Sequence, residues 1–65
     1  MQFTVVIEES EVPGFSREVI ITTSTAMEAH RLCYFNEIEA GEQIAEIRDQ
    51  NNQVVYDLSG FVDPF

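Results

Sequence analysis

Apolar and polar residues alternate along the start of the chain. Phe3, Val5 and Ile7 share one side of an extended segment, and the residues between them share the other. Alternation with a period of two is typical of a strand that is buried on one face. We therefore expect a strand over residues 2–9, with these three side chains in the core.

A second strand is expected directly after the first. The sequence Val12-Pro13-Gly14 favours a type II turn, because proline fits its second position and glycine its third. Residues 15–23 are rich in β-branched side chains, which favour strands. A short loop between two such segments predicts an antiparallel hairpin, with Val19 and Ile21 of its second strand buried.

The middle of the chain predicts a helix. Thr25 and Glu28 form a capping box, in which the Thr25 hydroxyl accepts from the Glu28 amide and the Glu28 carboxylate reaches back to Thr25. Good helix formers continue to Ala40, and Gly41 stands where a left-handed C-terminal cap is needed.

This helix has two apolar sides when its residues are placed at 100° intervals. The side with small residues allows close packing on a sheet, so we assign it to the core: Ala26, Ala29, Cys33 and Ala40. The other side holds Met27, Tyr34 and Ile38. Either the C-terminal tail covers these three with Phe61 and Phe65, or they form an interface with a second copy or another partner.

Two further strands are expected after the helix. In residues 42–49, strict alternation places Ala45 and Ile47 on one face and Ile44 and Glu46 on the other. Asn51-Asn52 predicts a two-residue type I′ turn, because asparagine tolerates positive φ.

Residues 54–58 form the last expected strand, and the apolar tail of residues 59–65 is expected to fold back over the core or an edge. The order is β-β-α-β-β, which predicts a single α+β domain over residues 1–65. Its simplest architecture is a four-stranded, mainly antiparallel sheet with one helix on a face. The pattern leaves the strand order open.

The net charge is more informative about function than the overall composition is. The chain has 12 acidic residues against 3 basic ones, a formal charge of −9, yet 45% of its residues are hydrophobic. Such a chain folds, unlike a disordered acidic tail. Its charge repels nucleic acid and anionic lipid, so we expect no direct binding to either.

The location of the protein is expected to be the cytoplasm. A lone cysteine cannot form an intrachain disulfide, and the chain shows neither a signal peptide nor an apolar stretch long enough to span a membrane.

The sequence predicts no catalytic residue, cofactor or metal site. It has no glycine-rich phosphate loop, paired-cysteine motif or nucleophile elbow. His30 and Cys33 are neighbours on the expected helix, but two ligands fall short of a zinc site. A catalytic dyad needs an exposed, activated thiolate. We expect Cys33 to be a buried structural thiol, and the protein not to be an enzyme.

The acidic residues fall into groups along the chain. Carboxylates near a helix C-terminus oppose its dipole, and like charges repel, so this arrangement costs free energy. Solubility is one explanation. The other is mimicry of a phosphate backbone, which predicts binding to a basic protein that handles nucleic acid. The candidate binding residues are Glu37, Glu39, Glu42 and Glu46, followed by Glu8, Glu9 and Glu11.

The size, the charge, the single cysteine and the acidic run over residues 37–46 resemble the small acidic inhibitors carried by phages, including anti-CRISPR proteins and other DNA mimics. That resemblance implies an inhibitor that blocks a nucleic-acid-binding surface in the host cytoplasm. Residues 3–9 also resemble the first strand of HicB-type antitoxins. The alternative is therefore a regulatory or structural module that dimerises or neutralises a toxin.

Overall fold

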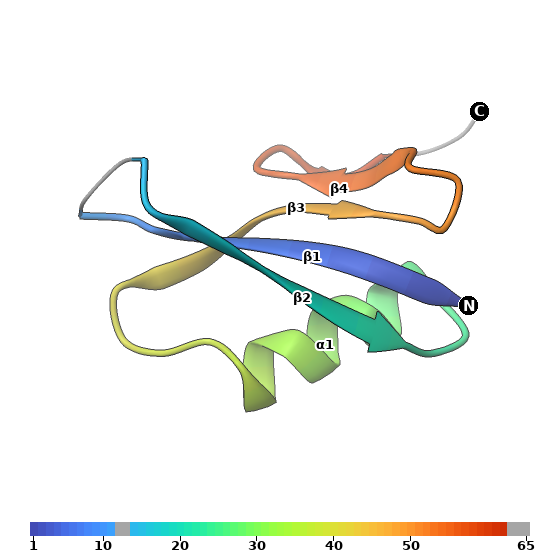
Figure 1. The fold of residues 1–65 in the computed structure, drawn as a ribbon, viewed down its shortest axis with the longest axis horizontal. Helices are drawn as coiled ribbons and strands as arrows, with labels where there is room; N and C mark the ends of the chain where they lie inside the picture. The colour runs from blue at the N-terminus through green and yellow to red at the C-terminus, as the bar shows by residue number, and fades with distance from the viewer. Residues whose placement is uncertain (12–13, 63–65) are drawn as a thin grey trace.

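A helix on one face of an antiparallel sheet makes up the fold (Figure 1). The computed structural model describes residues 1–11 and 14–62. Within them the elements are β1 (Gln2–Glu9), β2 (Ser16–Thr22), α1 (Ala26–Asn36), β3 (Glu42–Arg48), β4 (Val54–Asp57) and β5 (Gly60–Phe61). The strand order is β2-β1-β3-β4-β5. The α+β class is confirmed, but the four-stranded prediction missed the short fifth strand.

The hairpin of β1 and β2 forms as expected. Phe3, Val5 and Ile7 are buried beneath α1, and β2 pairs antiparallel with β1. Val19 and Ile21 are only partly buried, because β2 is the edge strand of the sheet. The predicted turn includes Val12 and Pro13, which lie outside the described residues. Gly14 has a φ of 101°, as the third position of a type II turn requires.

The small-residue side of α1 faces the sheet as predicted, with Ala29 and Cys33 fully buried and Ala26 partly buried against the core. The Thr25 hydroxyl accepts from the Glu28 amide at 3.1 Å, which confirms one half of the capping box. The Glu28 carboxylate instead accepts two hydrogen bonds from Arg31, at 3.1 and 2.9 Å.

The helix ends at Asn36, so its predicted continuation to Ala40 was wrong. The amides of Glu37 and Ile38 both donate to the Cys33 carbonyl, at 2.8 and 3.2 Å, and Ile38 then packs against the core. Gly41 has a φ of 87°, but it lies in a separate turn that the Glu42 amide closes onto the Glu39 carbonyl at 3.0 Å. Ala40 is therefore exposed rather than part of the core face.

A β-bulge in β3 changes which of its residues face the core. Val6 pairs with Glu46 while the next residue, Ile7, pairs with Ile44, so Ala45 is the extra residue. Both Ile44 and Ile47 are consequently buried, at 6% and 0% exposure. The strict alternation that grouped Ala45 with Ile47 was wrong at this position.

In the loop between β3 and β4, three residues rather than the predicted two lie inside the closing pair, Asp49 and Gln53. The Asp49 amide donates to the Gln53 carbonyl at 2.9 Å, and Asn52 has a φ of 63°. This geometry matches a three-residue hairpin loop whose last residue is left-handed. The Asp49 carboxylate stabilises it by accepting from the amides of Asn51 and Gln53, at 2.9 and 3.0 Å.

The C-terminal tail returns to the edge of the sheet, as expected, as far as Val62. Phe61 pairs with Tyr56, and the Val62 amide donates to the Val55 carbonyl at 2.9 Å. The rest of the tail, including Phe65, lies outside the described residues. No helix in the described part of the chain is long and apolar enough to cross a membrane.

Candidate functional site

The fold brings two acidic segments together at one end of the sheet, on the left of Figure 1. Glu9 of β1 pairs in register with Glu42 of β3. The amide and hydroxyl of Ser10 both donate to the Gly41 carbonyl, at 2.8 and 2.9 Å. These bonds hold the end of β1 against the turn before β3. We refer to the glutamates on these adjoining segments as the acidic end: Glu8, Glu9, Glu11, Glu37, Glu39 and Glu42.

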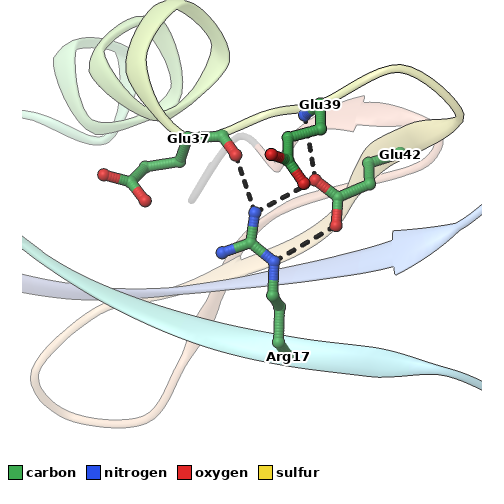
Figure 2. A network of polar contacts seen from close by, with 4 residues as sticks. All are labelled: Arg17, Glu37, Glu39 and Glu42. Carbon is green, nitrogen blue, oxygen red and sulfur yellow. Dashed lines mark hydrogen bonds and ion pairs between the residues drawn. The ribbon is translucent and has the colours of Figure 1, made fainter.

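A single arginine lies within this acidic end (Figure 2). Arg17 Nε and Nη2 donate to the two carboxylate oxygens of Glu42 at 3.1 and 3.0 Å, and Nη2 also donates to the Glu37 carbonyl at 2.6 Å. The Glu39 amide donates to the same Glu42 carboxylate at 2.9 Å. Arg17 therefore joins β2 to both the C-terminus of α1 and the start of β3.

Arg17 and Glu42 each stabilise the charged form of the other. The hydrogen bond from Arg17, and then that from the Glu39 amide, hold the pKa of Glu42 below its usual value. The pKa of Arg17 is raised, chiefly by its hydrogen bond to Glu42 and also by the charges of Glu37 and Glu39. Arg17 therefore compensates the negative charge of Glu42. The net negative charge of the acidic end comes from its other five glutamates.

Each basic side chain of the protein is engaged in an ion pair with a carboxylate of the same chain. Besides Arg17 with Glu42, Arg31 pairs with Glu28, and Arg48 pairs with Glu46. The remaining acidic residues therefore set the sign of the surface.

The structure separates Glu46 from the other three glutamates of the first predicted group. Because of the bulge at Ala45, Glu42 and Glu46 lie on opposite faces of the sheet. Glu46 lies in register with Val6 and Asp57, on the face that α1 leaves uncovered, and Glu8 shares that face with Val6 by the alternation of β1. Glu18 was not among the predicted binding residues, and it lies opposite Val6 on the same face. The alternation of the strand could have predicted this, because Glu18 is next to Val19 and therefore lies on the opposite face from it.

The predicted apolar interface is also divided. Met27 and Tyr34 are exposed, at 68% and 58%, whereas Ile38 packs against the core. Phe61 lies over His30 and Tyr56, with ring centroids 5.6 and 4.9 Å apart. The tail therefore reaches His30 and Tyr56, while Met27 and Tyr34 stay accessible.

The helix also carries the His30 and Cys33 pair considered above. Cys33 is fully buried, and burial, followed by the charge of Glu37, raises the pKa of its thiol to about 11. Burial lowers the pKa of His30. The thiol therefore stays protonated near neutral pH, which is unfavourable for a nucleophile. In the described part of the chain, no group of three His, Cys, Asp or Glu side chains is arranged to hold a metal ion.

No protein-family model, curated protein sequence or solved structure matches the chain.

Proposed function

We propose that this protein is a non-enzymatic inhibitor that occupies a basic, nucleic-acid-binding surface of another protein. The observation that carries the proposal is the acidic end, where two segments distant in the sequence bring six glutamates to one end of the sheet, and Arg17 bonds to Glu42 and to the Glu37 carbonyl. A surface of this kind offers a basic groove the charge that phosphates normally supply.

The spacing of the charges supports this proposal. Neighbouring strands lie about 4.8 Å apart, and one strand of a nucleic-acid duplex carries a charge about every 3.4 Å along its axis. The backbones that carry the glutamates are therefore spaced on the same scale as phosphates, and the uncompensated charge comes from Glu9 and from the glutamates of the flanking segments. The Arg17–Glu42 pair and the Ser10–Gly41 hydrogen bonds offset part of the repulsion and hold the segments in place.

The first experiment identifies a partner and tests competition. The immobilised protein is exposed to extracts of candidate host cells, and mass spectrometry identifies the retained proteins. A purified partner is then titrated with labelled nucleic acid, with and without this protein, at two salt concentrations. We expect mutual exclusion, and weaker inhibition at high salt. If both ligands bind the partner together without weakening each other, mimicry is wrong.

A matched pair of variants locates the interaction. Glu39→Lys lies in the acidic end and Glu18→Lys lies on the uncovered sheet face, and both glutamates are exposed. The two substitutions change the net charge equally. We expect Glu39→Lys to slow association more than Glu18→Lys does, because rim charges act mainly on the association rate. Equal effects would mean that only the total charge matters.

A second function, that of a regulatory module acting by dimerisation, is favoured by the exposure of Met27 and Tyr34. Exposed apolar patches with a polar rim mark contact sites. Light scattering over a range of concentrations separates this alternative from the first, since inhibition by charge mimicry does not require a dimer.

A further inference from the structure

The outer edge of β2 carries backbone groups that no strand of the described chain pairs. β2 is the last strand on its side of the sheet, and β1 is its only neighbour. At one end of their hairpin the Glu9 amide donates to the Phe15 carbonyl at 3.2 Å. At the other end the Thr23 amide donates to the Met1 carbonyl at 2.9 Å. The register between these ends is unbroken, so the odd-numbered residues of β2 direct their N–H and C=O groups at β1.

The even-numbered residues of β2 therefore direct their N–H and C=O groups outward, because the direction alternates along an antiparallel strand. These outward residues are Ser16, Glu18, Ile20 and Thr22, and all of them are exposed. No backbone group in the described part of the chain bonds to their outward side. A row of donors and acceptors with this repeat is complementary to another extended strand.

β2 lacks the usual features that prevent edge strands from pairing. Protected edges are short, bulged, interrupted by proline or rich in lysine. β2 has seven residues, pairs with β1 without a register shift, and contains neither proline nor lysine. β5, at the opposite edge of the sheet, has only two residues and is protected by its length. We therefore expect the edge of β2 to be paired in solution.

One register lets a second copy of β2 satisfy the whole edge. With a twofold axis at Val19, all seven residues of the two strands overlap. Ser16 then lies opposite Thr22 of the other copy, and Glu18 lies opposite Ile20, so every outward residue meets an outward residue. An axis at Glu18 would instead bring two carboxylates face to face, which is destabilising.

We propose that two copies of the chain pair through β2 and form a symmetric dimer with one continuous sheet. Pairing of like strands closes both open edges, so assembly stops at two copies. A strand of a different protein would leave the edge open until that protein was met. On the side of the sheet that α1 covers, Val19 meets its counterpart, and both side chains, partly buried in the single chain, lose further surface. This contact is independent of the proposed function.

The net charge opposes the dimer and gives it a characteristic salt dependence. Each copy has a formal charge of −9. In the proposed register the two copies of Glu18 are diagonal neighbours, about 7–8 Å apart. Salt screens this repulsion, so the dimer should become tighter as the salt concentration rises. A complex between the acidic end and a basic protein should show the opposite dependence.

Sedimentation velocity of the full chain, over a range of protein concentrations at low and high salt, measures the association. We expect a reversible equilibrium between monomer and dimer that shifts toward the dimer at high salt. Inhibition of a nucleic-acid-binding partner is expected to weaken at high salt. The two salt dependences therefore separate the dimer from the proposed function.

Two substitutions of Glu18 provide matched variants. Glu18→Pro and Glu18→Thr remove the same charge, but only proline removes an outward N–H and places its ring on the edge. Bonds to β1 are retained in both, because Glu18 donates away from β1. We expect Glu18→Pro to weaken the dimer at least about tenfold and Glu18→Thr to leave it as tight as the wild type or tighter. Circular dichroism checks that both variants fold.

Amide hydrogen exchange of the wild-type chain tests the edge without any substitution. The outward amides of Glu18 and Ile20 should exchange fast at low protein concentration and slowly at high concentration. The amides of Val19 and Ile21 already bond to β1, so their exchange should depend less on concentration.

Several outcomes overturn the inference. One is a chain that stays monomeric at every concentration and at both salt levels, and another is a dimer that Glu18→Pro and Glu18→Thr weaken equally. A dimer that Tyr34→Glu dissociates and Glu18→Pro does not would assign the contact to the exposed side chains of α1. Protection of the Glu18 and Ile20 amides only in the presence of another protein would assign the edge to that protein. The proposed function fails separately, in the nucleic-acid competition, whether or not the dimer forms.

Discussion

Replacing Ile44 with alanine tests the bulge in β3. This bulge determines which side chains of the strand point into the core. Because Ala45 is the extra residue, Ile44 lies in the core with 6% exposure. Strict alternation would have placed it on the opposite face from Ile47. The two arrangements predict different losses of stability for the same substitution.

The expected loss follows from burial. Truncation of a buried isoleucine to alanine removes its transfer free energy and leaves a cavity, which together cost about 2–5 kcal/mol. A chain of 65 residues has a total free energy of unfolding of only about 3–10 kcal/mol, at the usual stability per residue. Ile44→Ala should therefore lower the urea midpoint strongly, and it could leave the chain largely unfolded.

Ile20→Ala is the matched control. Ile20 also lies in a strand, but its side chain is 57% exposed. Both substitutions lose the same β-propensity, so the difference between them reports burial. We expect Ile20→Ala to cost about 1 kcal/mol or less. Equal losses for the two variants in urea unfolding would refute the bulge and the core that it creates.

Three further predictions concern a cap, an ion pair and a thiol. Thr25→Ala removes the hydroxyl that caps α1 and should lower the free energy of unfolding by about 1 kcal/mol, measured by urea denaturation. The pKa of folded Glu42 lies below its unfolded value, so its ion pair with Arg17 stabilises the fold above the unfolded pKa, and this is lost as pH falls through the folded pKa. The stability difference between wild type and Arg17→Gln, measured by urea denaturation over a pH series, should therefore shrink on acidification. With its pKa raised to about 11, buried Cys33 should react slowly with iodoacetamide near neutral pH and much faster in urea.

The parts of the fold that depend on local pattern could be predicted from the sequence. The phase of β1, the buried side of α1 and the Thr25 cap each follow from residues close together in the chain. The bulge at Ala45 could not be predicted, because it arises from the register between β1 and β3. The end of α1 at Asn36 likewise depends on Ile38 packing against a core formed by distant strands.

The candidate site shows the same division. Its acidic residues were visible in the sequence as two groups, but their meeting depends on β1 and β3 being neighbours. The sequence leaves the strand order open, so it does not predict the pairing of Glu9 with Glu42. Arg17 had no distinguishing signal, because its role comes from the position of β2 beside the C-terminal end of α1.

The position of Arg17 bears on whether the acidic end serves only solubility. Charges kept for solubility are best spread over the surface, where repulsion is least. Here the Ser10–Gly41 hydrogen bonds bring two acidic segments into contact, and one of three arginines is bound to the second segment through Glu37 and Glu42. The same arginine satisfies the Glu37 carbonyl, so the segment carrying Glu37 and Glu39 is fixed relative to the sheet. A fixed set of carboxylates complements a basic groove better than a mobile one, because less side-chain and loop entropy is lost on binding.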